Sequence, residues 1–191
     1  KKNRLGSKIA ISGKGRCNIT NAGDIDRFVQ FYPGNGKFLY ASLREFDNLA
    51  LIDFFERLNV KFKTERGGRV YTQADDSEVI VSALKQYLAD EKVKIILGRK
   101  VTGLLSEKGK ICGVKMPGNK EHSEEILPSG AVIIATGGAS FPGTGSTGDG
   151  YIFARQVGHK VIEPLPALVP LRTMEEWPKS LQGLTLRNVK V

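Results

Sequence analysis

The sequence predicts an α/β domain organised around a parallel sheet, and one stretch near the C-terminal half carries this prediction. Residues 131–135 are a short, fully apolar run with β-branched side chains, which is typical of a strand buried on both faces. The run ends at Thr136, and six glycines follow before Tyr151. Because open α/β sheets bind ligands beyond the carboxyl ends of their strands, we interpret this glycine loop as a ligand site and not as a plain surface turn.

Three helices are predicted before this stretch. Apolar residues at helical spacing occur over 37–46, and again after Asp47 as far as Leu58, with Asp47 suited to cap the second of these helices. A third helix is predicted to begin at Asp75, because Glu78 three residues later completes a capping-box pattern. The apolar stripes of these helices are most simply explained as core.

A change of period after the third helix predicts β-structure. Short runs rich in β-branched and other apolar residues predict strands over 93–97, 101–105, 111–116 and 160–162. Residues 107–110 are predicted to join two of them as a hairpin, and residues 118–129 to form a polar hairpin loop or excursion. A helix over 149–157, ended by Gly158, follows the glycine loop.

The composition favours a globular protein with a solvated basic surface. The 191 residues include 29 Lys and Arg against 20 Asp and Glu, a formal net charge of +9. These charges are interspersed, and no RNA-recognition, zinc-finger or basic-zipper signature occurs. No apolar run could span a membrane. The two cysteines, Cys17 and Cys112, indicate neither a disulfide framework nor a metal site, and a reducing cytoplasm is the expected location.

The domain organisation is predicted from a proline-rich segment. Residues 164–171 are too rich in proline for a helix or a central strand and are predicted to form a rigid connector. We therefore divide the chain into a domain over 1–171 and the start of a second domain over 172–191. The first residue is not Met and no signal peptide is present, while the last residues stop within a strand-like pattern, so both ends look cut.

The match to G-x-G-x-x-G at residues 143–148 is not interpreted as the primary dinucleotide fingerprint. Such a fingerprint follows its strand at once, whereas Thr136 to Pro142 intervene here. The acidic residue expected about 20 residues further on is also missing. Neither His122 nor His159 has a visible catalytic partner, so both are interpreted as ordinary polar or capping residues.

A second candidate ligand loop lies near the N-terminus. Residues 12–21 combine glycines with Arg16, Asn18 and Asn21, a set of donors suited to an anionic or heteroaromatic ligand. A solvated turn explains the same residues about equally well. Arg16 is expected to lower the pKa of the neighbouring Cys17 somewhat, although a small residue filling space beside a ligand is a simpler explanation of Cys17 than a redox role.

The same loop resembles a family signature. Residues 12–21 are similar to the S-G-x-G-R-C-N-x-T-N motif of the BaiN-like, or aminoacetone oxidase, family of FAD-dependent flavoproteins. Four further segments agree with that family, namely 33–39, 135–138 with 144–150, 166–171 and 180–184. Lys14 stands where the family usually has Gly, and Thr72 where Pro is common. The resemblance covers essentially the whole chain.

The resemblance implies a glutathione-reductase-type FAD/NAD(P)-binding domain, with a β-meander and the start of a second, substrate domain. It also implies that this domain is incomplete, because the family begins with a βαβ unit of roughly 30 residues that is absent here. The cofactor-binding residues that it implies are Ser12, Gly13, Lys14, Gly15, Arg16, Cys17, Asn18, Val101, Thr136, Gly137, Gly138, Gly148 and Asp149. Val101 would contact the adenine, and Thr136, Gly137 and Gly138 would lie by the ADP half of FAD.

The expected function is that of an FAD-dependent oxidoreductase that transfers hydride or electrons between the flavin and a small organic substrate. NAD(P)H is a candidate electron donor, and neither nucleic acid nor membrane is expected as a partner. The sequence identifies no substrate, acid–base residue or oligomeric state. The alternative is a non-catalytic nucleotide- or RNA-binding module, which rests on the net charge and the glycine loops.

Overall fold

The computed structural model describes residues 3–32, 34–118, 123–166 and 172–184. The N-terminal half contains the helices α1 (Ser7–Ile11), α2 (Ile25–Gln30), α3 (Tyr40–Glu45), α4 (Asn48–Arg57) and α5 (Glu78–Asp90), with 3-10 turns at Ser12–Gly15 and Gly36–Leu39. Three strands lie among them, β1 (Thr20–Asn21), β2 (Phe62–Glu65) and β3 (Arg69–Thr72). The second half contains β4 (Gly103–Glu107), β5 (Lys110–Pro117), β6 (Glu124–Pro128), a 3-10 turn at Pro142–Thr144, α6 (Asp149–Gln156) and α7 (Trp177–Ser180).

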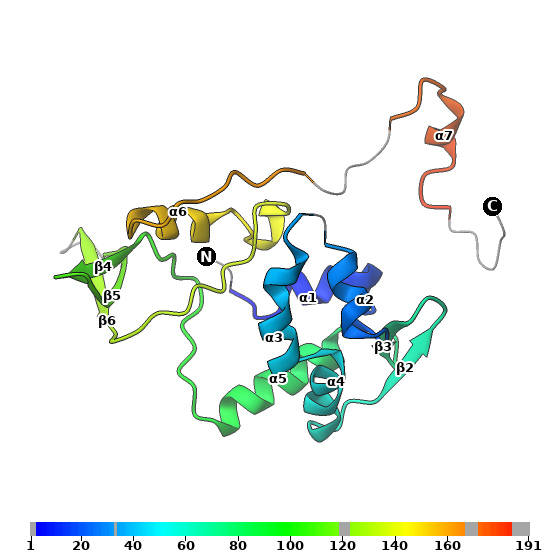
Figure 1. The fold of residues 1–191 in the computed structure, drawn as a ribbon, viewed down its shortest axis with the longest axis horizontal. Coiled ribbons are helices and arrows are strands. Elements are labelled where there is room, and N and C mark those ends of the chain that lie inside the picture. The colour runs from blue at the N-terminus through cyan, green and yellow to red at the C-terminus, as the bar shows by residue number, and fades with distance from the viewer. Residues whose placement is uncertain (1–2, 33, 119–122, 167–171, 185–191) are drawn as a thin grey trace.

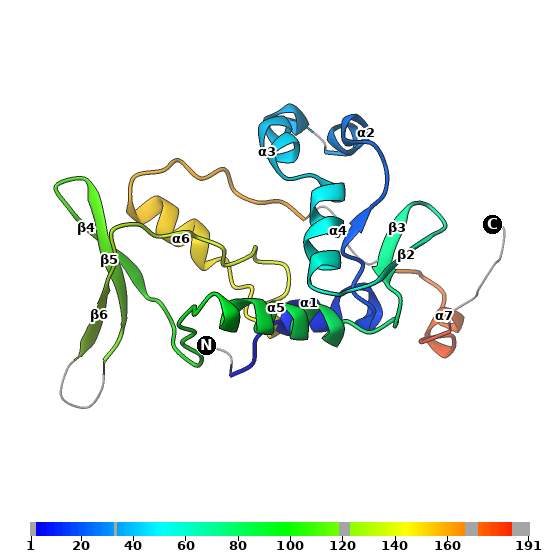
Figure 2. The same ribbon diagram turned by 90° about the horizontal axis from the view of Figure 1, so that it is seen from below.

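The described strands form two small antiparallel sheets, with orders β1-β3-β2 and β4-β5-β6. The first sheet belongs to the helical cluster of α1 to α5 (Figure 1). The second lies with α6 on one side of that cluster, and α7 lies away from the other elements (Figures 1 and 2). Among the described residues, no helix is both long and apolar enough to cross a membrane.

The hydrophobic core lies between α4, α5 and the strand β2. Its buried members are Cys17, Phe55, Val60 and Ile80. The Phe55 ring packs edge-on against Phe54 at a centroid distance of 5.1 Å and against Phe62 at 6.3 Å. Cys17 anchors the N-terminal loop in this core, which fixes that loop on the helical cluster.

The sequence predicted helix caps at Asp47 and Asp75, and only the first is confirmed. Asp47 caps α4 as predicted, accepting from the Ala50 N–H at 2.7 Å. The predicted capping box at Asp75 is wrong, because Asp75 lies in a left-handed conformation outside the helix and forms ion pairs with Lys63 and Arg16. At the start of α5 it is the Asp76 side chain that accepts from an N–H, that of Glu78, at 2.8 Å.

The β4–β5 hairpin and α6 are confirmed, and α6 contacts the start of β4. Its Gln156 side chain accepts from the Leu104 N–H at 3.1 Å and donates to the Leu104 carbonyl at 3.0 Å. Gly158 follows α6 with a φ of 90°, as its predicted role at the helix end requires. The predicted polar excursion over 118–129 contains the strand β6, which pairs with β5; residues 119–122 lie outside the described part.

The predicted strands at 93–97, 131–135 and 160–162 are not strands in the structure. Ile133 is 91% exposed and Ile162 is 78% exposed, so the prediction of a doubly buried run at 131–135 is wrong for the described residues. The physical reason is the lack of a neighbour, because an extended run becomes a strand only where another strand satisfies its N–H and C=O groups. Of the predicted connector, residues 164–166 have no regular structure and 167–171 lie outside the described residues.

Candidate functional site

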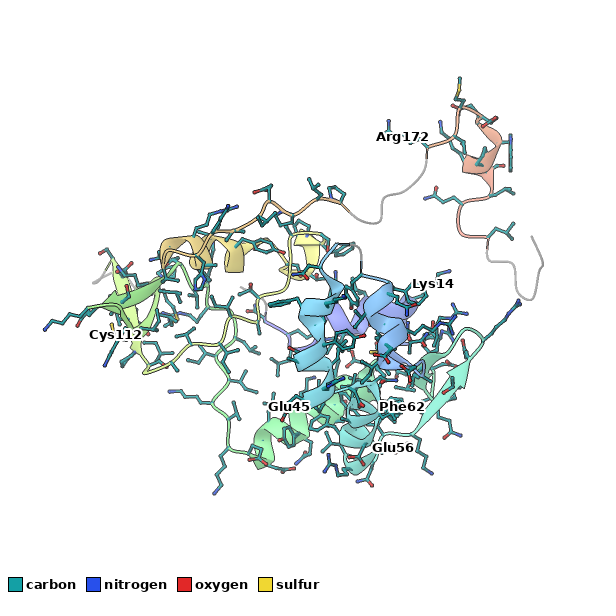
Figure 3. All side chains as sticks on the ribbon, viewed as in Figure 1. Lys14, Glu45, Glu56, Phe62, Cys112 and Arg172 are labelled. Atoms are coloured by element: carbon teal, nitrogen blue, oxygen red, sulfur yellow. The ribbon has the colours of Figure 1, made fainter. Side chains whose placement is uncertain are left out.

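The N-terminal loop of residues 12–18, called the arginine loop below, has an unusual backbone. Gly13, Lys14, Gly15 and Cys17 all have positive φ, of 56°, 58°, 86° and 56°. At Gly13 a Cβ would lie 2.7 Å from the Asn18 nitrogen, so glycine is required there by packing as well as by conformation. Lys14 adopts the left-handed conformation without being glycine, and its exposed side chain extends from the helical cluster (Figure 3).

Backbone hydrogen bonds hold the arginine loop in place. The Cys17 N–H donates to the Ser12 carbonyl at 3.0 Å, and the Ser77 N–H at the start of α5 donates to the Gly15 carbonyl at 2.8 Å. The Ser77 hydroxyl donates to the Ala10 carbonyl at 3.0 Å, which ties the end of α1 to the same point. The loop is therefore a preformed structure held by α5 and α1.

The Arg16 side chain is directed to protein groups. Its guanidinium donates to Glu65 at 2.8 Å and to Asp75 at 3.2 Å. It also lies over the Tyr71 ring, 3.9 Å from the centroid. The hydrogen bond to Glu65 is the main cause of the raised pKa of Arg16, and desolvation partly opposes it. Arg16 thus connects the arginine loop to the hairpin of β2 and β3.

Burial decides the chemistry of Cys17, and the prediction of a lowered pKa is wrong. Cys17 is only 5% exposed, and this burial raises the pKa of its thiol, while a hydrogen bond involving Ser12 opposes the change. The positive charge of Arg16 is held by Glu65 and Asp75 instead of facing the sulfur. Cys17 is therefore a core residue, and we expect its thiol to react slowly. Cys112 lies in the β4–β6 sheet, far from the arginine loop (Figure 3).

Ser12 and Asn18 use their polar atoms locally. The Ser12 hydroxyl donates to the Ile9 carbonyl at 2.8 Å. The Asn18 amide fits its surroundings when its nitrogen faces the carbonyls of Val70 and Thr20, at 3.1 and 2.9 Å. Both side chains thus stabilise the loop.

The second candidate segment, residues 136–149, is called the glycine loop below. The Gly148 N–H donates to the Gly138 carbonyl at 3.2 Å, which brings the two ends of the loop together. A Cβ at Gly150 would lie 2.6 Å from the Thr136 hydroxyl oxygen, so the first turn of α6 packs directly on the start of the loop. The Thr147 hydroxyl, in the loop, donates at 2.8 Å to Asp149, the first residue of α6.

The structure connects the two loops through α1. The Lys8 ammonium lies over the Phe141 ring, 4.9 Å from its centroid. Lys8 belongs to α1, which leads directly into the arginine loop, while Phe141 belongs to the glycine loop. Val101 lies two residues before β4, the strand that α6 contacts through Gln156 and Leu104. The predicted residues thus lie in two loops that touch through Lys8 and Phe141, and at one position just before β4.

Sequence reasoning missed the residues that hold Arg16. Glu65 and Tyr71 come from the β2–β3 hairpin, and Asp75 from the segment before α5. No motif marks them, because they meet Arg16 only after the chain has folded over 49 to 59 residues of sequence. In the sequence, these residues are marked only by a short turn with acidic and aromatic residues near it.

Comparisons with known proteins identify the family. A family model described as "HI0933-like protein Rossmann domain" matches residues 1–190. The chain is 34% identical over 172 residues to a 3-dehydro-bile acid delta(4,6)-reductase of Clostridium scindens, covering 90% of this chain and 39% of that protein. It is 28% and 27% identical to ribosomal RNA dihydrouridine synthases of Haemophilus influenzae and Escherichia coli, covering 96% and 94% of this chain.

The chain spans about two fifths of the length of these curated relatives, since the matched regions cover 39%, 45% and 42% of them. The matches confirm the resemblance that the arginine-loop motif indicated, and they support a Rossmann-type α/β domain. With a family model matching residues 1–190, this chain belongs to the HI0933-like family.

Proposed function

We propose that this chain is part of the FAD-binding domain of an oxidoreductase, and that the arginine loop and the glycine loop lie against the cofactor. The observation that carries the proposal is the open space beside two glycines, Gly15 and Gly138, one in each loop. A Cβ at Gly15 would meet nothing within 4 Å, and a Cβ at Gly138 would meet only the Tyr151 hydroxyl at 3.6 Å. A larger residue could replace Gly138 without backbone strain or a clash with the protein. This favours a ligand as the reason for the open space.

The donor set of the two loops fits a dinucleotide. The successive left-handed residues Gly13, Lys14 and Gly15 curve the backbone as in the nests of main-chain N–H groups that bind anions, which would suit a pyrophosphate or the anionic reduced flavin. Asp149, in the first turn of α6, carries a negative charge and suits the hydroxyl groups of a sugar better than a phosphate. When bound, FAD would supply the hydride chemistry, and the protein would supply placement and electrostatics.

Within this proposal Arg16 acts on the cofactor through the loop backbone. Its guanidinium is held by Glu65, Asp75 and the Tyr71 ring. These contacts fix the positions of Gly15 and Cys17 on either side of it. Arg16 is therefore proposed as a positioning residue for the arginine loop.

The exposed apolar runs fit a larger sheet. Residues 93–97, 131–135 and 160–162 are rich in apolar side chains and have no strand partners in the described structure. We propose that they become strands of the parallel Rossmann sheet in the whole protein, with a βαβ unit supplying the neighbouring strands. The exposure of Ile133 and Ile162 supports this, because side chains of this size are normally buried.

The relatives favour reduction as the reaction. A reductase and a dihydrouridine synthase both add hydrogen to an organic substrate, and they share this region of sequence with the present chain. We propose that the whole protein reduces a small unsaturated substrate, with NAD(P)H as the candidate electron donor and the cytoplasm as its location. Val101 remains a proposed adenine contact.

The visible absorption spectrum of the whole natural protein tests this function. We expect a yellow protein with flavin absorbance that NADH or NADPH bleaches in the absence of oxygen. A colourless protein that gains no flavin absorbance after incubation with FAD would instead favour the non-catalytic nucleotide- or RNA-binding module.

A further inference from the structure

A cavity outside the two loops combines aromatic walls with unpaired positive charge. It has a volume of about 700 Å³ and lies between α2 and the turn that joins β2 to β3. Phe28, Phe31 and Tyr32 form its aromatic side, and Gly67 and Gly68 form part of its floor. This volume is in the range of small-molecule sites in proteins.

The floor of the cavity is preformed. The Asn21 amide nitrogen donates to the Gly67 carbonyl at 2.7 Å, and its amide oxygen accepts from the Gly23 N–H at 2.9 Å. The Ala22 N–H donates to the Gly68 carbonyl at 2.7 Å. A Cβ at Gly68 would lie 2.6 Å from the Asn21 amide oxygen, so the close approach of the two segments depends on this glycine. The cavity therefore needs no rearrangement to exist.

Two of the aromatic side chains face water. Phe31 is 75% exposed and Tyr32 is 53% exposed, although both line the cavity. Flat aromatic faces that are accessible at a cavity are suited to stack on planar rings, and they stack on bases with little sequence preference.

The charged side chains considered at this cavity are all arginines. Arg27 lines it, and Arg66 and Arg69 flank the two glycines of its floor. Within the described residues these three guanidinium groups have no carboxylate partner, although the Arg69 Nε–H donates to the Arg66 carbonyl at 3.2 Å. Five other arginines form ion pairs with Asp or Glu: Arg4, Arg16, Arg57, Arg99 and Arg155.

The acidic residues nearby face a different cavity. Asp24 and Asp26 line the neighbouring cavity, together with Asp47, and Asp26 accepts from the Tyr40 hydroxyl at 2.9 Å. In the part of the chain that the structure describes, no carboxylate lines the aromatic cavity. An anionic ligand there would meet the Arg27 guanidinium, while the carboxylates of Asp24 and Asp26 lie at the neighbouring cavity.

We propose that this aromatic cavity binds a nucleobase together with its phosphate, the base stacking on Phe31 and Tyr32 and the phosphate meeting Arg27. A planar ring with an attached anion is the ligand chemistry that matches an aromatic wall beside the Arg27 guanidinium. This site goes beyond the proposed flavin function, and it requires no flavin to form. A free nucleotide and a base within a single-stranded RNA share this chemistry.

Fluorescence anisotropy with the whole natural protein tests the site. The probes are a labelled oligouridine of about 12 nucleotides, a length suited to a single-strand groove, and unlabelled UMP as competitor. Replacing both aromatic side chains (Phe31→Ala with Tyr32→Ala) is expected to weaken binding about tenfold or more. Arg27→Gln is expected to weaken it and to lower the slope of log affinity against log salt by about one.

Matched controls change similar residues elsewhere. Phe46→Ala removes another half-exposed aromatic side chain, and Arg57→Gln removes an exposed arginine of α4, and neither lines the cavity. Both controls should bind as the natural protein does. Thermal melting and flavin absorbance of all variants are measured alongside, so that loss of fold or of cofactor is seen separately.

The outcomes separate the two sources of the ligand and can refute the site. Oligouridine that binds at least about 100-fold more tightly than UMP indicates single-stranded RNA, and similar affinities indicate a free nucleotide. The site is refuted if neither probe binds, or if binding survives both the aromatic and the Arg27 changes in proteins that melt normally.

Discussion

The stability of the arginine loop can be tested at Gly13. In the structure its φ is 56°, and a Cβ built there would lie 2.7 Å from the backbone nitrogen of Asn18 and 3.2 Å from the Tyr71 ring. The Gly13→Ala change therefore introduces both a strained conformation and a contact with backbone that cannot simply rotate away. Gly15 is the matched control, because its φ is 86° but a Cβ there would meet nothing within 4 Å.

The expected loss of stability is the sum of a conformational cost at either glycine and a packing cost at Gly13. Holding a residue with a Cβ in the left-handed region costs about 1–2 kcal/mol, and this applies to both glycines. Forcing backbone apart adds about 1–3 kcal/mol, and this applies only to Gly13. We expect Gly13→Ala to lower the free energy of unfolding by about 2–5 kcal/mol and Gly15→Ala by about 1–2 kcal/mol.

Urea unfolding followed by circular dichroism measures the difference between the two variants. The flavin content of each purified variant is measured in parallel. Since Gly15 faces open space, Gly15→Ala should lose more flavin than its small loss of stability explains. Equal losses of stability in the two variants would refute the close approach of Gly13 to Asn18 on which this reasoning depends.

Three further predictions concern the core thiol, an exposed ion pair and the sheet. Because burial raises the pKa of Cys17, iodoacetamide at pH 8 should modify Cys112 first and Cys17 only on unfolding. Mass spectrometry of tryptic peptides measures the two rates of modification. Equal rates would contradict the burial of Cys17. The pKa of Asp75 is lowered, chiefly by its hydrogen bond to Lys63, so the stabilising effect of this carboxylate is present above about pH 4 and is lost as pH falls through its folded pKa. Asp75→Asn should therefore flatten the acid side of the plot of melting temperature against pH. An unchanged plot would contradict the ion pair. Residues 1–191 expressed alone should bind FAD weakly and aggregate, because the run at 131–135 lacks its neighbours; tight one-to-one FAD binding by calorimetry would show that no βαβ unit is needed.

Local features were predictable from the sequence. The helix α4, its cap at Asp47, the β4–β5 hairpin and the end of α6 at Gly158 all depend on residues within a few positions of one another. Helical spacing, capping and turn chemistry act over this range, so the sequence carries them directly. The family, too, could be identified from the short motif of the arginine loop.

Features that depend on distant partners were not predictable in the same way. The run at 131–135 has the composition of a buried strand, but composition does not supply the strands that must pair with it. Asp75 has the spacing of a cap, yet Lys63 and Arg16 attract its carboxylate elsewhere. The pKa of Cys17 was predicted from its neighbour in sequence, whereas burial in the core governs it. In the candidate site, Glu65 and Tyr71 were missed for the same reason.

The central claim is that the glycine loop faces FAD, and the Gly138→Ala variant of the whole protein tests it most directly. A Cβ at Gly138 would lie at an ordinary 3.6 Å from the Tyr151 hydroxyl, so the variant should fold and melt as the natural protein does. Titration of FAD into the apoproteins is expected to give a dissociation constant at least about tenfold higher for Gly138→Ala, which corresponds to about 1.4 kcal/mol. Equal dissociation constants for the two proteins would contradict the placement of the cofactor against this loop.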